Sequence, residues 1–235
     1  MIRFARVAAA IDAERIKLTT VRSPWWAALG AAALSLGTAA LQTVPGPALG
    51  IAVFGVPVLM VVAATTVTGE YRTAMARTTF LAVPDRTLVL CAKAVVAALF
   101  SSIFAALIVL GAIVVARLDI DAGGWRSTGA VAIYAALAAV LGVGAAALLR
   151  HTAGAVTVLL LWPLLVEPLL GNLPRTAGQI GPYLPFANVL RFLDVQWLFP
   201  NFTAPWGPLG SLGYFALVVA VVFVAAVLVV NLRDA

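Results

Sequence analysis

Charged side chains are scarce in this sequence. Asp, Glu, Lys and Arg make up only 10% of its 235 residues, while hydrophobic residues make up 63% and the mean hydropathy is +1.09. A composition this apolar excludes an ordinary water-soluble domain. It predicts instead a protein that places most of its length in a lipid bilayer.

Side chains for catalysis and metal binding are equally rare. One cysteine, Cys91, and one histidine, His151, are present. They exclude an internal disulfide, a Cys- or His-based metal site, and any Ser-His-Asp set that does not use His151. No Gly-rich loop ending in Lys-Ser/Thr occurs, so the chain cannot bind ATP as P-loop proteins do. We therefore expect no catalytic residue, bound cofactor or metal, and we do not interpret the chain as an enzyme.

Six apolar runs are each long enough to cross a bilayer, which takes roughly 20 helical residues. Their continuous Ala, Val and Leu, without strict alternation, favour helices over barrel strands. We predict an all-α integral membrane protein with a single transmembrane domain, 1–235. The expected transmembrane helices are 24–43, 48–68, 88–116, 127–149, 152–170 and 209–231.

Lys and Arg are distributed unequally between the two ends of these spans. Eleven lie at one end: Arg3, Arg6, Arg15, Lys17, Arg22, Arg72, Arg77, Arg86, Lys93, Arg150 and Arg233. The remaining four of the 15 lie at the other: Arg117, Arg126, Arg175 and Arg191. Basic residues favour the cytoplasmic side, which predicts that both termini are cytoplasmic. The same residues flank helices rather than form one patch, so no nucleic acid partner is expected despite the net charge of +6.

The N-terminal segment, 1–22, has the pattern of an amphipathic helix. Phe4, Val7, Ile11 and Leu18 fall on one helical stripe, with basic residues on its flank. Such a helix would lie on the inner membrane surface with its cations toward anionic headgroups. A structural anchor and a lever connected to a partner both fit this pattern.

A short charged stretch, 69–86, separates the second and third expected spans. On a helical wheel Glu70, Thr73 and Arg77 share one face. The other face carries Tyr71, Ala74, Met75 and Thr78. We expect the first face to present charge to a soluble partner and the second to pack on the ends of the spans. An ordinary amphipathic loop helix is the alternative.

The segment 171–208 is long and rich in Leu, Phe, Trp and Pro. Its apolar pieces are too short to span, so we expect helices that dip partway into the outer leaflet or lie on it. Trp197, Trp206 and Tyr214 suit the aromatic belt at the membrane interface. A loosely packed external loop is the alternative.

Glu167 is the acidic residue expected nearest to a span interior. Intramembrane carboxylates are costly and often functional. Because Glu167 lies near the predicted outer end of its helix, we expect water or Arg175 to satisfy it, and favour a structural or interfacial role over a substrate or proton site. The scarcity of buried charge favours a path for an apolar or amphipathic substrate.

Small residues are expected to bring the helices close together. Packing rather than hydrophobicity drives helix association in lipid. The glycines interpreted in this way are Gly30, Gly37, Gly142 and Gly144.

Several segments resemble the membrane subunits of type 2 ABC exporters, especially those of actinobacteria. They are RIKLTTVRSPWW (15–26), GEYRT (69–73), RTT (77–79), AVPDR (82–86) and PYLPFA (182–187). With the six-span layout, the resemblance to this permease family covers nearly the whole chain. It implies that 1–22 is a connecting helix, that 69–86 holds a cytoplasmic coupling helix, and that half-buried helices precede the last span.

The resemblance also implies partners and a location. Glu70, Tyr71, Arg72, Thr73 and Arg77 would dock on a separate ATP-binding subunit that holds ATP and Mg²⁺, two copies per complex. A second permease subunit, identical or homologous, would complete the path through the bacterial plasma membrane. Members of the family export drugs, lipids, polysaccharides and peptides, so the substrate stays open.

These features favour the permease subunit of an ATP-driven efflux system. The alternative is a non-transporting membrane scaffold or sensor that binds a cytoplasmic regulator through 69–86. A secondary carrier ranks third because few ionisable residues lie within the spans.

Overall fold

The computed structural model describes residues 2–41, 46–73, 75, 79, 85–119, 121–173, 177–195, 197–200 and 202–232. All regular structure in these ranges is helical, which confirms the all-α prediction. The principal helices are α1 (Ile2–Thr20), α2 (Arg22–Ala40), α3 (Val56–Arg72), α5 (Arg86–Val115), α6 (Ala122–Leu149), α7 (Thr152–Leu161), α8 (Glu167–Asn172), α9 (Ala177–Ile180), α10 (Pro185–Phe192) and α11 (Pro208–Leu232).

Five of the helical segments are long and apolar enough to cross a membrane. They are Ile51–Arg72, Arg86–Val115, Ala122–Leu149, Thr152–Asn172 and Pro208–Leu232. Each exceeds the roughly 20 residues that a bilayer requires. By length and composition, the chain is therefore a multi-pass membrane protein.

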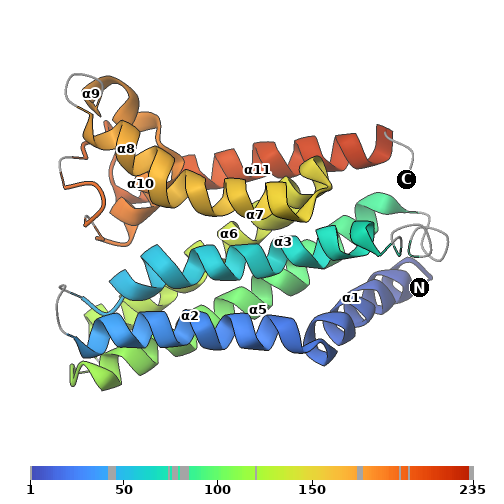
Figure 1. Cartoon of the computed structure of the whole chain (residues 1–235), viewed down its shortest axis with the longest axis horizontal. Helices are drawn as coiled ribbons and strands as arrows, with labels where there is room; N and C mark the ends of the chain where they lie inside the picture. Colours follow the sequence, from blue (N-terminus) through green and yellow to red (C-terminus); the bar gives the residue numbers. More distant parts are fainter. Residues whose placement is uncertain are drawn as a thin grey trace.

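The first expected span, 24–43, stays a prediction. Helix α2 covers most of it and packs along α5 and α3 (Figure 1). Its 19 residues begin with Arg22 and include Gly, Ser and Thr among the alanines, and it is less apolar than those five segments.

Two spans contain a π-helical turn beside a proline. The first, Ile51–Gly55, precedes Pro57, and the second, Trp162–Val166, contains Pro163 and precedes Pro168. Proline removes a backbone donor and clashes with the carbonyl four residues earlier. The wider turn accommodates that clash while the helix continues, so neither span is broken.

Polar side chains cap the N-termini of three helices. Asp85 accepts a hydrogen bond from the Leu88 amide (2.9 Å) at the start of α5, and Asp121 accepts one from the Gly124 amide (2.8 Å) at the start of α6. His151 does the same for α7 through Nδ1, 3.2 Å from the Gly154 amide. These caps satisfy amides that have no partner within the helix.

Helix α6 is the centre of the bundle and packs against α3, α5 and α11. A Cβ at Gly142 would collide with the Met60 carbonyl of α3, and one at Gly144 would lie 3.3 Å from Phe223 Cα of α11. The close approach expected at these two glycines is confirmed. At Gly30 and Gly37 it is wrong, because nothing lies within 4 Å of either Cβ position.

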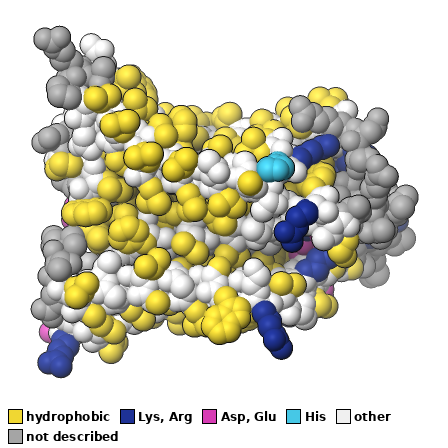
Figure 2. Space-filling model, viewed as in Figure 1, with side chains coloured by type: hydrophobic (Ala, Val, Ile, Leu, Met, Phe, Trp, Pro, Cys, Tyr) yellow, Lys and Arg dark blue, Asp and Glu magenta, His cyan; other side chains and the backbone are white. Residues whose placement is uncertain are grey.

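The two ends of the bundle differ. Helix α1 and the last turn of α11 lie at one end, which we call the terminus end, on the right in Figure 1. Helices α8, α9 and α10 lie at the opposite, loop end. Figure 2 shows hydrophobic side chains along the middle of the bundle and most of the visible Lys and Arg toward the terminus end. Which end faces the cytoplasm stays a prediction.

Glu167 joins two elements of the loop end. Its side chain is fully buried, and one carboxylate oxygen accepts hydrogen bonds from the amides of Phe186 (2.8 Å) and Ala187 (3.1 Å) in α10. The other accepts from Trp162 Nε1 at 2.9 Å. The N-terminus of α10 and Trp162 thus satisfy the carboxylate, as the expected structural role requires. Arg175, one of the two predicted partners, lies outside the described residues.

Helix α10 is packed rather than loose. Phe186, Ala187, Val189 and Leu190 are buried, and the helix lies against α11. Nearby, Trp206 stacks on Tyr214 with ring centroids 5.5 Å apart, and its Nε1 donates to Asn188 Oδ1 at 2.9 Å. The alternative of a loosely packed loop therefore does not describe this part of 171–208.

Candidate functional site

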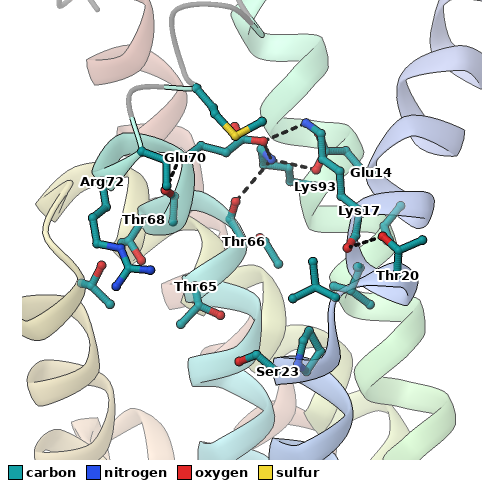
Figure 3. Close-up of a pocket in the computed structure, with 18 residues that line it drawn as sticks. Glu14, Lys17, Thr20, Ser23, Thr65, Thr66, Thr68, Glu70, Arg72 and Lys93 are labelled. Atoms are coloured by element: carbon teal, nitrogen blue, oxygen red, sulfur yellow. Dashed lines mark hydrogen bonds and ion pairs between the residues drawn. The ribbon is translucent and has the colours of Figure 1, made fainter.

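Four charged side chains meet at the terminus end, and we call them the charged cluster: Glu14 and Lys17 of α1, Glu70 of α3 and Lys93 of α5 (Figure 3). Lys93 Nζ lies 2.7 Å from both Glu14 Oε2 and Glu70 Oε1. Lys17 Nζ lies 2.8 Å from Glu14 Oε1 and 2.8 Å from Glu70 Oε1. Each lysine thus bridges both carboxylates, and the cluster ties three helices together.

The cluster is largely removed from solvent. The exposed fraction of the side chain is 4% for Lys93, 8% for Glu14 and 14% for Glu70, against 40% for Lys17. Lys93 lies within the apolar span α5 and also donates to the Thr66 carbonyl of α3 at 3.3 Å. A buried ammonium is tolerated only when it is paired and hydrogen-bonded. The two carboxylates therefore satisfy a charge that the bundle could not otherwise hold.

The charge of Lys17 is stabilised by the same carboxylates. Partial burial alone would lower the pKa of this ammonium, but hydrogen bonds and charge attraction from Glu14 and Glu70 outweigh it and raise the pKa above 10.5. Lys17 is therefore charged at neutral pH.

Helix α1 presents a different stripe to the bundle from the predicted one. Ala10, Glu14 and Leu18, spaced four residues apart, are its buried positions, and Val7 is 38% exposed. Of the predicted stripe, Leu18 is buried and Ile11 half-buried, while the side chain of Phe4 lies outside the described residues. The difference has an electrostatic cause, since Glu14 pairs with Lys93 of α5 and Lys17 pairs with Glu70 of α3.

A cavity of about 640 Å³ opens beside the cluster, between the α1–α2 junction, the end of α3 and the start of α7. Its polar wall includes Lys17, Ser23, Thr65, Thr66, Thr68, Arg72, Lys93 and Thr152. Its apolar wall includes Leu18, Val21, Pro24 and Val96. Figure 3 shows the Arg72 side chain beside Thr68, across the cavity from Lys17.

The residues expected to dock a partner are not arranged as the helical wheel predicts. Helix α3 continues to Arg72, so Glu70, Tyr71 and Arg72 belong to the end of a span rather than to a separate helix. The prediction that Glu70 presents its charge outward is wrong, because the carboxylate faces Lys17 and Lys93. Tyr71 is half-buried under the Arg150 guanidinium, 5.2 Å from its ring centroid.

The rest of the expected docking set is exposed or undescribed. Arg72 and Thr73 are exposed at the end of α3. Arg77, like most of 74–84, lies outside the described residues. Docking through these three residues stays a prediction.

Glu14, Lys17 and Lys93 of the charged cluster are not among the site residues predicted from the sequence. The sequence predicts Lys93 to be one of the cations that flank spans. In the structure it lies about two turns inside the 30-residue apolar helix α5. A lysine at such a depth signals a need for acidic partners, and few carboxylates lie near that end of the bundle. That signal alone does not choose between Glu14, Glu70 and Asp85.

The charged cluster connects three helices through shared ion pairs. Its carboxylates are paired with lysines, and no group of three or more His, Cys, Asp or Glu that could hold a metal occurs among the described residues. Moving α3 at Glu70 would pull on α1 and α5 through shared ion pairs.

Comparisons with protein-family models, curated proteins and solved structures found no match to this chain.

Proposed function

We propose that this chain is the permease subunit of an ATP-driven exporter of the type 2 ABC class. It would form, with a second permease subunit, the path for an apolar or amphipathic substrate such as a drug or a lipid. ATP would be bound and hydrolysed on two copies of a separate subunit. The terminus end would face the cytoplasm of a bacterial cell.

The charged cluster is the observation that carries this proposal. Glu70 lies at the end of α3, next to the GEYRT segment on which the family resemblance rests, and Lys17 and Lys93 join it to α1 and α5. A force applied to the end of α3 would reach both helices without a flexible link. Rigid connection of this kind is what a membrane subunit needs to follow the motion of an ATPase.

The structure divides the five expected docking residues into two groups. Glu70 and Tyr71 hold the end of α3 to the bundle through Lys17, Lys93 and Arg150. The exposed Arg72 and Thr73, with Arg77 from the sequence, are the residues that we propose to touch the ATPase. The inward pair would act as positioning residues.

The substrate class follows from the charges along the spans. Lys93 and Glu167 lie within the apolar segments, and both are fully engaged, Lys93 by two carboxylates and Glu167 by three donors. Neither is left to bind a charged substrate or to carry a proton. This favours an apolar or amphipathic cargo over an ion-coupled one.

The test is co-purification with a candidate ATP-binding subunit produced together with this chain. Arg77→Glu is the informative variant because it reverses a predicted contact charge and leaves all four residues of the charged cluster in place. Arg126→Glu is its matched control, since Arg126 lies in the first turns of α6, at the opposite end of the bundle. Glu70→Arg is unsuitable because it would place three cations together and disturb folding.

We expect wild type and Arg126→Glu to retain the ATP-binding protein, and Arg77→Glu to lose most of it while staying folded. Equal retention by all three would remove Arg77 from the interface. No retention by folded wild-type protein would overturn the exporter assignment in favour of a scaffold or sensor.

A further inference from the structure

We propose that the cavity beside the charged cluster binds the phosphate group of a phospholipid from the adjacent leaflet. The site would be occupied whether or not the chain transports anything, so it does not depend on the proposed function. The charge of the cavity wall, its hydrogen-bonding groups and its position in the bundle support this binding.

The cavity wall carries an excess of positive charge. Lys17, Arg72 and Lys93 face two carboxylates, those of Glu14 and Glu70. The lysines neutralise the carboxylates within the cluster. Arg72 makes no ion pair with any residue in the described part of the chain, although its side chain points along the cavity (Figure 3). One cation therefore remains to attract an anion.

The unpaired cation is of the type best suited to phosphate. A guanidinium donates two parallel hydrogen bonds to a phosphate, which adds geometric selectivity to charge attraction. Lys17, whose side chain is 40% exposed, lies on the opposite wall, and an ammonium has a third N–H to donate besides the two that Glu14 and Glu70 accept. A phosphate between the two would lie among cations rather than replace an existing ion pair.

Hydroxyl groups supply the remaining contacts. Thr65 and Thr66 are half-buried along α3, and their hydroxyls donate to the Val62 and Ala63 carbonyls at 2.8 and 2.7 Å. Ser23 and Thr152 add hydroxyls from α2 and α7. A hydroxyl rotates to donate or accept as its neighbours require. These groups can therefore bind phosphate oxygens or the polar glycerol of a lipid.

The apolar wall distinguishes a lipid from a soluble phosphate. Leu18, Val21, Pro24 and Val96 line the cavity on the side of the α1–α2 junction. Beside this junction Trp25 is 42% exposed and donates from Nε1 to the Thr19 carbonyl at 3.0 Å. An exposed tryptophan with its polar atom satisfied is typical of the membrane interface. The cavity thus opens at the depth where headgroups and acyl chains meet.

The size of the cavity fits a headgroup and glycerol. About 640 Å³ falls within the roughly 300–1,000 Å³ of typical small-molecule sites. The acyl chains would extend past the apolar wall into the bilayer. Phosphate recognition would come from Arg72 and Lys17, and orientation from the apolar residues.

The experiment is calorimetric titration of the purified full-length chain in detergent with a short-chain phosphatidylglycerol. Two further ligands separate the sources of affinity: the corresponding diacylglycerol, which lacks phosphate, and inorganic phosphate, which lacks the chains. The variants are Arg72→Gln and, as a control, Arg22→Gln. Arg22 is exposed, lies at the same end of the bundle and does not line the cavity.

We expect Arg72→Gln to weaken phosphatidylglycerol binding by about tenfold or more, the effect of losing a hydrogen bond to a charged group. Arg22→Gln should bind as the wild type does, and the diacylglycerol should bind as weakly to the wild type as phosphatidylglycerol does to Arg72→Gln. Equal affinity of wild type and Arg72→Gln, or no binding by folded wild type, would overturn the site. Inorganic phosphate binding as tightly as the lipid would overturn the lipid and assign a soluble phosphate instead.

Discussion

Lys93 forms ion pairs with Glu14 and Glu70, and only 4% of its side chain is exposed. Replacing it by methionine would keep most of its volume and leave Glu14 and Glu70 close together with one lysine between them. Removing one partner of a buried ion pair costs about 3–5 kcal/mol of unfolding free energy. We expect Lys93→Met to lower the thermal unfolding midpoint of the purified protein strongly.

The chain contains its own control for this change. Arg15 and Asp12 pair on the outer face of α1, 3.3 Å apart, with exposed fractions of 65% and 61%. Exposed ion pairs contribute about 0–1 kcal/mol, so Arg15→Met should leave the unfolding midpoint nearly unchanged. If the two variants unfolded at the same temperature, the cluster would not hold the helices together.

The alkaline pH dependence of stability should report on Lys17. Its pKa is raised above 10.5 in the folded protein, so the folded state holds this proton more tightly than the unfolded chain. The stabilisation is complete below pH 10.5 and disappears as the pH rises through the higher folded pKa. The unfolding midpoints of wild type and Lys17→Met should therefore differ by a constant amount around neutral pH. They should converge as the pH rises above the folded pKa of Lys17. A difference that vanished near neutral pH would contradict the ion pairs of Lys17.

Glu167 should control the protection of α10. In Glu167→Leu the amides of Phe186 and Ala187 lose their acceptor while still buried, at a cost of about 1–3 kcal/mol. We expect these two amides to exchange hydrogen faster, with Glu167→Gln intermediate because it keeps one acceptor oxygen. Amides in the middle of α6 serve as the internal reference. Unchanged exchange at Phe186 and Ala187 would show that the carboxylate does not fix α10.

At the scale of elements, α3 and α6 pack closely because Gly142 of α6 has no side chain at the contact. Gly142→Ala would press Cβ against the Met60 carbonyl, which cannot move without shifting α3. We expect a loss of about 1–3 kcal/mol, the usual cost of overpacking. Denaturant titration of the purified protein would measure it.

The matched substitution is Gly30→Ala in α2, where nothing lies within 4 Å of the new Cβ. Alanine is favoured over glycine in a helix by about 0.8–1.0 kcal/mol. Gly30→Ala should therefore be neutral or stabilising. Equal destabilisation by both substitutions would contradict the assignment of the Gly142→Ala effect to the α3–α6 contact.

The elements show how far apolar patterning can predict this protein. Length and hydropathy alone locate the five long apolar helices, because a bilayer imposes a simple rule on them. The orientation of α1 was not predictable in that way. Its buried face is centred on Glu14, which pairs with Lys93, 79 residues further along the chain, while Lys17 pairs with Glu70, 53 residues further along. Such pairing depends on which helices become neighbours, and periodicity within α1 carries no information about that.

Glu167 illustrates the same limit at the loop end. The cost of an intramembrane carboxylate indicated that it needed partners, but not which ones. The partners are two backbone amides about 20 residues away and Trp162. Backbone donors leave no trace in residue type, so the N-terminus of α10 could not be identified from the sequence.

At the scale of the whole molecule, the bundle places its charged cluster, its lipid-sized cavity and the exposed end of α3 together at the terminus end. The proposed ATPase contact and the proposed phospholipid site would then be neighbours, sharing Arg72. Different variants test the two proposals, Arg77→Glu for the ATPase contact and Arg72→Gln for the lipid site, and the lipid titration needs no ATPase. The two proposals can therefore fail independently.

ATP hydrolysis in reconstituted vesicles tests the central claim most directly. A candidate ATP-binding subunit would be assayed alone, with the wild-type chain, with Arg77→Glu and with Arg126→Glu. We predict that the wild-type chain and Arg126→Glu change the hydrolysis rate of the ATP-binding protein and that Arg77→Glu does not. A hydrolysis rate unaffected by the folded wild-type chain would contradict the assignment of this protein as the membrane half of an ATP-driven exporter.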